Sequence, residues 1–167
     1  MVPGVTSALP AWIETERLRL IPVTPEDATD MRAGRRQQRW HRDYPRPDDV
    51  DAVSLVRAGD DGHWGPRHVV LGFEAVGSIG CFAAPEEGEA EVGFGLVPDV
   101  RRRGVTTEAL RGLLAATDTV GVRLRASVDP ANAASLRVLA RCGFSELRGS
   151  NADGELVMVR PLTRAEP

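Results

Sequence analysis

Three consecutive arginines stand beside a glycine in the stretch RRRGVTTEAL, residues 101–110. The stretch follows an apolar run with glycines, VGFGLVP, and it begins the apolar spacing that is typical of a helix. A helix N-terminus exposes unpaired backbone N–H groups and a partial positive charge, and a glycine there lets an anion approach the backbone closely. The residues Arg101, Arg102, Arg103 and Gly104 are therefore a candidate anion site.

The same residues fit a nucleic-acid patch, a pocket for a small polyanion, or a solvated helix start. The 167-residue chain carries a formal net charge of -3, whereas nonspecific nucleic-acid binding needs a broad basic face. We therefore expect no nucleic-acid partner. A second group of arginines lies at positions 32–42, so a nucleic-acid or protein interaction module remains the alternative function. The pattern GxxxxGK[ST] is absent and GFGLVP lacks a third glycine, so the sequence does not indicate an ATP or dinucleotide site.

Other side chains are candidates for proton transfer. Glu91 lies near the start of an expected strand and shares a face with Gly93 and Gly95, so its carboxylate could line a cleft as a general base; an exposed strand end is the alternative. Glu89 stands beside it. Histidines titrate near neutral pH, but the three histidines of this chain fall in or beside expected loops: His41, His63 and His68.

Composition restricts the class of protein. The length and the 42% hydrophobic content suit one compact domain over residues 1–167. Neither a signal peptide nor a long apolar segment is present in the sequence, so we expect a cytoplasmic protein without a membrane partner. The two cysteines, Cys81 and Cys142, lack ligand spacing, and we expect both to be buried hydrophobic residues rather than metal ligands or a disulfide.

Periodicity and turn residues predict an α+β order of strand, two helices, three strands, helix, strand, helix and two strands. The expected strands are residues 16–23, 68–73, 78–84, 89–97, 122–128, 144–149 and 155–162, with EAVG at 74–77 as the first hairpin turn and 151–154 as the last. The expected helices run from the cap at Thr24 to about Arg39, over 48–59 to Gly59, from about Gly104 to Thr119, and over 134–144 with closure at Gly143.

Two motifs in this order support a more specific interpretation. The segment EVGFGLVPDVRRRGVTTEALRGLL, followed by a strand and DPANAASLRVLARCGF, resembles the GNAT superfamily of N-acetyltransferases, and with the opening TERLRLIPVTPEDA it is similar to the RimJ/RimL branch. The resemblance covers most of the chain. It implies a central mixed, mostly antiparallel sheet of about seven strands flanked by about four helices.

By this resemblance the ligand is acetyl-CoA, with no metal. The family loop Gln/Arg-x-x-Gly-x-Gly/Ala reads here as Arg101 to Thr106, and Thr106 replaces the usual small residue. The residues implied to contact CoA are Leu96 and Val97 on a strand edge, Arg101, Arg102, Arg103, Gly104, Val105, Thr106 and Thr107 in the loop, and Asn132, Ser135 and Arg141. A strand bulge would leave one N–H free to polarise the thioester carbonyl. Asn132 is also a good helix cap, and Arg141 could instead be a solvated side chain.

The resemblance implies direct transfer of the acetyl group to a primary amine, either a protein N-terminus or a small molecule. We expect Glu91 as base and Ser135 as acid, because Leu139 stands where many relatives carry a tyrosine. Trp40 and Tyr44 could wall the acceptor cleft, although Trp40 also suits a core anchor, and Asp43, Asp48, Asp49 and Asp51 suggest an acidic rim. A non-catalytic acyl-CoA sensor is the alternative, and both a monomer and a homodimer are compatible with the sequence.

Overall fold

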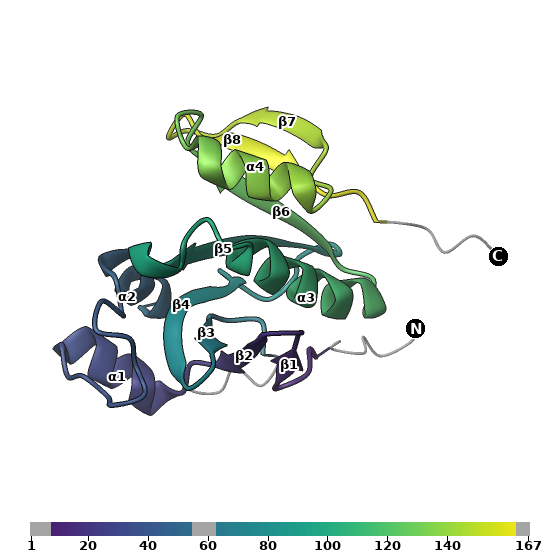
Figure 1. The fold of residues 1–167 in the computed structure, drawn as a ribbon. Helices are drawn as coiled ribbons and strands as arrows, with labels where there is room; N and C mark the ends of the chain where they lie inside the picture. Colours follow the sequence, from purple (N-terminus) through teal and green to yellow (C-terminus); the bar gives the residue numbers. More distant parts are fainter. Residues whose placement is uncertain (1–7, 55–62, 163–167) are drawn as a thin grey trace.

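The computed structural model describes residues 8–54 and 63–162, which contain one eight-stranded mixed sheet (Figure 1). Its strand order is β1-β2-β3-β4-β5-β6-β8-β7, and every neighbouring pair except β5 and β6 is antiparallel. The strands are β1 Ile13–Glu14, β2 Leu18–Pro22, β3 Arg67–Leu71, β4 Glu74–Cys81, β5 Glu89–Leu96, β6 Arg123–Val128, β7 Glu146–Ser150 and β8 Leu156–Val159. The expected α+β fold is confirmed, with the two-residue edge strand β1 as the element that the sequence did not predict.

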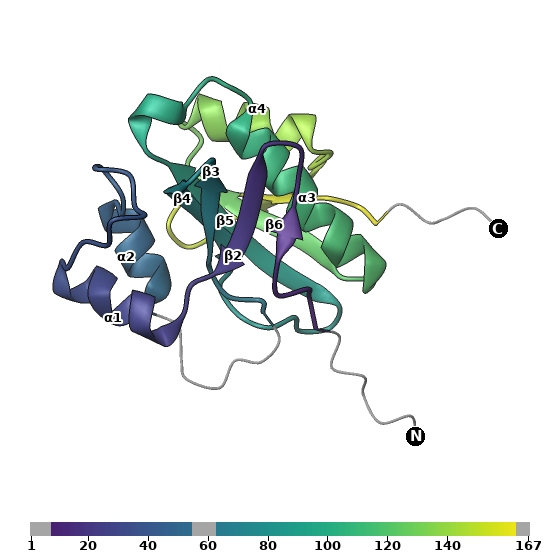
Figure 2. The same cartoon turned by 60° about the horizontal axis from the view of Figure 1, so that its bottom comes forward.

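Four α-helices occur in the described residues, together with the short 3-10 helix η1 Pro98–Val100. They are α1 Pro25–Ala33, α2 Pro47–Val53, α3 Val105–Thr119 and α4 Ala133–Arg141. Figure 2 shows α1 and α2 lying together, apart from α3 and α4. None of the helices in these two ranges is long and apolar enough to cross a bilayer.

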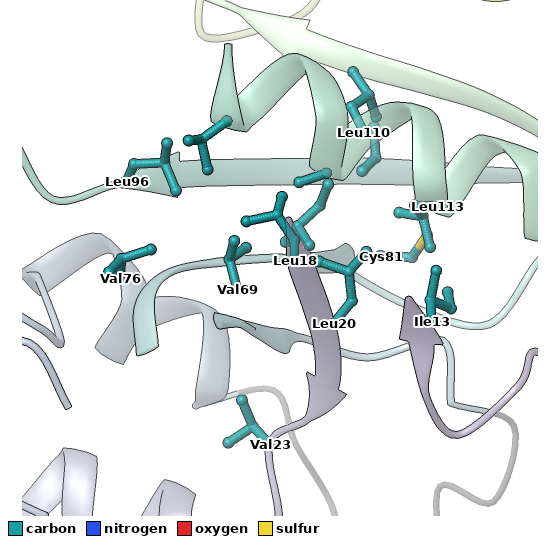
Figure 3. Packing of buried hydrophobic residues seen from close by; sticks show 14 of the residues in the cluster. Ile13, Leu18, Leu20, Val23, Val69, Val76, Cys81, Leu96, Leu110 and Leu113 are labelled. Carbon is teal, nitrogen blue, oxygen red and sulfur yellow. The ribbon is translucent and has the colours of Figure 1, made fainter. Parts of the chain in front are cut away.

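The apolar face of α3 packs on the sheet. Leu110 and Leu113 are fully buried and point toward Leu18 and Leu20 of β2 (Figure 3). The sequence shows the helical spacing of Leu110 and Leu113 and the alternation of Leu18 and Leu20. Each pattern places apolar side chains on one side of its element, and both sides pack into the same core. This packing fixes the N-terminus of α3 relative to β2.

Two elements end earlier than their patterns predicted. Helix α1 stops at Ala33 because Gly34 adopts a left-handed conformation (φ 70°) and its N–H bonds back to the carbonyls of Asp30 and Met31. The arginines that follow therefore lie in a loop and not on a helix face; Arg36, for example, donates to backbone carbonyls of that loop. Helix α2 ends at Val53, and its expected end at Gly59 lies outside the described residues.

The first hairpin also turns at a different place. β3 and β4 are joined by Gly72 and Phe73, where Gly72 has φ 63°, so EAVG belongs to β4 and is not the turn. The glycine supplies the positive φ that a tight two-residue connection requires. The strands on either side keep the expected antiparallel pairing.

β5 and β6 pair over only three residues. Glu89, Ala90 and Glu91 face Arg123, Leu124 and Arg125 in parallel register, after which β6 pairs with β8 alone. Among the described residues, nothing pairs with β5 on this side beyond Glu91. Figure 1 shows the two strands side by side at one end and diverging toward the other.

Three arginines bind Glu89 at the end where β5 and β6 are still paired. Glu89 of β5 is nearly buried and accepts hydrogen bonds from Arg123 (2.8 Å), Arg125 (3.2 Å) and Arg148, which come from β6 and β7. The hydrogen bonds from Arg148, acting against partial burial and joined by those of Arg123 and Arg125, lower the pKa of Glu89 to about 2. The carboxylate thus ties three strands together at the point where β5 and β6 begin to part.

This contact predicts a pH-dependent contribution to stability. Because the pKa of Glu89 falls from its ordinary 4.5 to about 2 on folding, its charge stabilises the fold above pH 4.5, and the stabilisation is lost as the pH drops from 4.5 toward 2. We expect Glu89→Gln to lower the free energy of unfolding by about 3 kcal/mol at pH 7 and by less than half of that at pH 3. Urea unfolding at both pH values measures the difference. Glu74→Gln, at an exposed residue of β4, is the control, and a loss independent of pH would contradict the assignment.

Candidate active site

A cavity of about 380 Å³ runs through the sheet where β5 and β6 part. Its walls come from α2 and β4 on one side, from the separated stretches of β5 and β6, and from α4 on the other side. The polar lining residues are Arg46, Asp48, Asp49, Ser78, Ser127, Asp129, Asn132, Ser135 and Glu155. The cavity therefore connects the face of the sheet covered by α2 with the face covered by α4.

The unpaired edge of β5 forms one wall. In a strand, backbone groups of alternate residues point to opposite neighbours, and Glu91 and Val97 bond to the β4 side through Phe82 and Val76. The backbone groups of Val92, Phe94 and Leu96 consequently point toward the gap left by β6. The Leu96 carbonyl is already taken by the Arg101 side chain (3.0 Å), which leaves its N–H as the free group.

Val97 does not offer the strand edge that the resemblance implied. Its side chain is fully buried, its N–H donates to the Val76 carbonyl (2.8 Å), and its carbonyl accepts from Val100 (3.3 Å). The register of β4 against β5 is regular, so no bulge frees an N–H in the described part of this pair. The available edge thus lies earlier along β5, at Val92 and Phe94, three to five residues before Val97, and at the N–H of Leu96.

The arginine–glycine loop exposes backbone N–H groups as expected. Arg102 (φ 63°) and Gly104 (φ 73°) are both left-handed, and the N–H of Glu108 makes the first α-helical bond, to the Gly104 carbonyl (3.0 Å). In the described residues no acceptor lies within bonding distance of the N–H groups of residues 102–107. The loop side chains are exposed at Arg101, Arg102 and Arg103, half-buried at Thr106, and buried at Val105 and Thr107.

Helix α4 brings Asn132 and Ser135 to the opposite wall of the cavity. The Asn132 side chain accepts from the backbone N–H of Ser135 (3.1 Å), so it caps α4, while the Ser135 hydroxyl has no partner among the described residues. Leu139 lies one turn further along the same face and also lines the cavity. Arg141 lies at the exposed end of α4, where its carbonyl accepts from Arg111, and it does not line the cavity.

Glu91 reaches the cavity through another residue. Ser127 of β6 lines the cavity and donates its hydroxyl hydrogen bond to Glu91 (2.7 Å), and the Arg125 guanidinium lies 3.7 Å from the same carboxylate oxygen. Glu91 itself is not among the lining residues. The pair Glu91–Ser127 bridges β5 and β6 at the end of their paired stretch, from the last paired residue of β5 to the second residue after the last paired one of β6.

Trp40 and Tyr44 lie in the core and not in the cavity wall. Both are at most 2% exposed, and their rings meet edge to face. The Tyr44 hydroxyl bonds to His68 (2.7 Å), whose other ring nitrogen bonds to the buried Asp27 (2.9 Å). Burial, reinforced by the nearby carboxylates, raises the pKa of Tyr44 well above 10. This network anchors α1 and the loop after it to β3. Trp40 is therefore a core residue, which was the alternative that the sequence allowed for it.

The α2 side of the cavity carries residues that the sequence did not single out. A side chain at Gly95 would overlap the Arg46 guanidinium, and one at Gly93 would overlap the Phe82 ring, so these two side chains lie across β5. Arg46 is held by two hydrogen bonds to Asp49, and Ser78 donates to the same carboxylate. Of the expected acidic rim, Asp48 and Asp49 line the cavity, whereas Asp43 lies near His41 and Asp51 is outside the lining; Glu155 joins them from the last hairpin.

The cysteines are buried as expected. Burial raises the pKa of Cys81 to about 12 and also raises the pKa of Cys142, whose thiol lies 3.8 Å from the Thr107 carbonyl. Cys81 lines the cavity but is only 3% exposed. Neither group is suited to act as a nucleophilic thiolate.

Solved structures resemble this fold over nearly the whole chain. An acetyltransferase from Agrobacterium tumefaciens is 26% identical with a TM-score of 0.66, covering 92% of this chain and 95% of its own. Mycobacterium smegmatis RimJ, solved with CoA-disulfide, is 23% identical with a TM-score of 0.63 (95% and 89% covered). The microcin C7 self-immunity acetyltransferase MccE, solved with acetyl-CoA and AMP, is 14% identical with a TM-score of 0.66 (92% and 98% covered).

A comparison with curated protein sequences found no significant match. The family profile described as an acetyltransferase (GNAT) domain matches residues 17–145, which include β2 through α4, the loop before α3 and the cavity walls on both sides of the sheet apart from Glu155. On this match and the shared fold, the chain belongs to the GNAT family of acetyltransferases.

Proposed function

We propose that the chain acts as a single domain that transfers an acetyl group from acetyl-CoA directly to a primary amine. The observation that carries the proposal is the parting of β5 and β6 after Glu91, which opens a cavity through the sheet and leaves one strand edge unpaired. Such an opening lets a donor and an acceptor approach the same point from opposite faces. RimJ and MccE, whose folds this chain shares, were solved with CoA-disulfide and with acetyl-CoA.

The donor side is built for a diphosphate and an amide-containing arm. The free N–H groups of residues 102–107 and the N-terminus of α3 would hold the CoA diphosphate, with Arg102 and Arg103 adding charge. The amides of the pantetheine arm would pair with the β5 edge at Val92, Phe94 and the Leu96 N–H. Asn132 and Ser135 would contact the arm from α4, and the exposed Arg141 is free to meet a CoA phosphate.

The acceptor side needs a group that removes a proton from an ammonium. We assign this role to Glu91 acting through Ser127: the ammonium gives a proton to the Ser127 oxygen while the serine passes its own proton to the carboxylate. The neutral nitrogen then attacks the thioester carbon; as the C–N bond forms and the C–S bond breaks, the nitrogen loses its second proton, which ends on the departing sulfur as the CoA thiol. Asp48 and Glu155 at the cavity would attract the cationic form of the acceptor.

The departing CoA sulfur needs a proton or a hydrogen bond. The Ser135 hydroxyl lines the cavity without a partner among the described residues, so it can donate a hydrogen bond to the sulfur as the C–S bond breaks and pass on the proton that the nitrogen gives up. A thiol with a pKa near 8.5 is a moderate leaving group, and a neutral hydroxyl is an adequate donor for it. The acceptor is a protein N-terminus or a small amine.

Calorimetric titration with acetyl-CoA and thiol-release assays over a panel of amines test the proposal. We expect binding of acetyl-CoA and amine-dependent release of CoA. Binding without release for any amine of the panel would support an acyl-CoA sensor instead. Failure to bind acetyl-CoA, with salt-dependent binding to RNA, would contradict the proposal and favour an interaction module.

Gly104→Val is expected to weaken acetyl-CoA binding at least tenfold, because a branched side chain would cover the exposed amides and strain the left-handed loop. Gly121→Val is the matched control: Gly121 has φ 71°, stands in similarly open space and lies at the far end of α3. Both variants should lose comparable stability in thermal melts. Equal acetyl-CoA affinity in the two variants would contradict the loop assignment.

Glu91→Gln and Ser127→Ala should each lower kcat by roughly 10- to 100-fold toward an amine identified in the panel, with unchanged affinity for acetyl-CoA. Because the two residues act as one relay, the double variant should be no slower than the slower single variant. Ser127→Thr retains a hydroxyl and should restore part of the rate. Losses that multiply in the double variant would show that the residues act separately.

Ser135→Ala should lower kcat roughly tenfold at pH 7, since the sulfur would leave without a donated proton. The backbone N–H that caps α4 through Asn132 is retained in this variant, so the fold should not change. The defect should shrink above about pH 8.5, where the thiolate is stable without a proton. A defect that is constant from pH 6.5 to 9.5 would argue against a proton donor.

A further inference from the structure

The turn between β1 and β2 reaches across to the first turn of α3. Arg17 of this turn donates from its Nε to Glu108 (2.7 Å) and from its backbone N–H to the other oxygen of the same carboxylate (2.8 Å). The Thr15 hydroxyl donates to Glu108 as well. Three donors from one turn therefore fix a carboxylate that lies four residues after Gly104.

The same arginine also holds the loop itself. Arg17 Nη1 donates to the backbone carbonyl of Arg103 at 3.0 Å. In a trans peptide the carbonyl and the following N–H point in opposite directions, so holding the Arg103 carbonyl directs the N–H of Gly104 away from Arg17. Gly104, whose φ is left-handed (73°), directly follows this peptide, so the orientation of the peptide and the conformation of Gly104 are linked.

Charge gives Arg17 a second effect on this loop. Partial burial works to raise the pKa of Glu108, but hydrogen bonds from Thr15 and from Arg17 bring it below its ordinary value, so the carboxylate is ionised at neutral pH. An anion in the first turn favours the helix dipole but would repel a diphosphate bound at the same N-terminus. Arg17 neutralises that charge, and its Nη2, which has no partner in the described part of the chain, would lie 3.6 Å from a Cβ at Gly104.

The side chains of the three arginines in the loop do not supply a positive charge that is held in place in the same way. Arg101 is directed back to the Leu96 carbonyl, and neither Arg102 nor Arg103 has a side-chain partner that would fix it, among the residues described. Arg17 is tied at Nε and Nη1 and so holds one position. The most firmly placed positive charge beside the exposed amides thus comes from a turn more than eighty residues earlier in the chain.

We propose that Arg17 is a positioning residue for the CoA diphosphate: it orients the amides of the loop before α3 and cancels the charge of Glu108 beside them. The inference rests on the proposed function, because the diphosphate belongs to acetyl-CoA. It adds a residue from the N-terminal turn to a site whose other members follow β5.

The test compares two acyl donors that differ in the diphosphate. Arg17→Gln should raise the Kd for acetyl-CoA at least tenfold in calorimetry. It should leave the Kd for S-acetylpantetheine, which ends before the diphosphate, unchanged in ligand-detected NMR. Arg19→Gln is the matched control: Arg19 lies on the adjoining strand and, among the described residues, its side chain donates only to the Gly72 carbonyl (3.4 Å), so neither Kd should change.

A second variant separates positioning from a general loss of structure. Adding Glu108→Gln to Arg17→Gln removes the repelling charge and should recover part of the acetyl-CoA affinity, although it cannot restore the carbonyl contact. Unchanged acetyl-CoA affinity in Arg17→Gln, or an equal loss for both acyl donors, would overturn the inference alone. A wild-type chain that binds neither donor would overturn the proposed function and this inference with it.

Discussion

The chemistry proposed for this chain depends on the loss of one neighbour by β5. Parallel pairing with β6 ends at Glu91, and β6 continues against β8 instead. A strand edge with free backbone groups is costly in a protein interior, because unpaired polar groups lose their hydration without gaining partners. Here the edge faces a cavity, where a ligand with amide groups can supply the missing partners. Glu89 and its three arginines close the other end and fix the point of divergence.

The two glycines of β5 allow other side chains to pack directly against the strand beside the cavity. Gly93 and Gly95 leave room for the Phe82 ring and the Arg46 guanidinium directly on the strand. Larger residues at these positions would displace both side chains from the strand. The positive charge of Arg46 and the negative charge of the buried Asp49 carboxylate cancel each other. The remaining charged residues of the cavity wall are Asp48, Asp129 and Glu155.

Much of this arrangement could be predicted from local sequence pattern, and the failures share a cause. The helix over α3, its start at Gly104 and the final hairpin follow from periodicity and turn residues within short windows. Ser127 and Arg17 could not be found in this way, since their partners lie 36 and 91 residues away and no local pattern marks them. Tyr44 was placed at the cleft by its type, but its hydroxyl is satisfied by His68 in the core, and such pairing is invisible before the fold is known.

The proposed relay through Ser127 bears on which amines the site could use. Deprotonating an α-amine with a pKa of about 7.8 costs roughly 1 kcal/mol at pH 7, whereas a lysine side chain near 10.4 costs roughly 4.6 kcal/mol. Glu91 does not line the cavity and meets it only through the Ser127 hydroxyl, 2.7 Å from the carboxylate, so in the proposed relay it takes up the proton indirectly. A base that acts through a neutral hydroxyl suits an amine that loses its proton at small cost. If the proposed relay operates, an α-amino group is a better acceptor than a lysine side chain, because only the α-amine is neutralised at small cost.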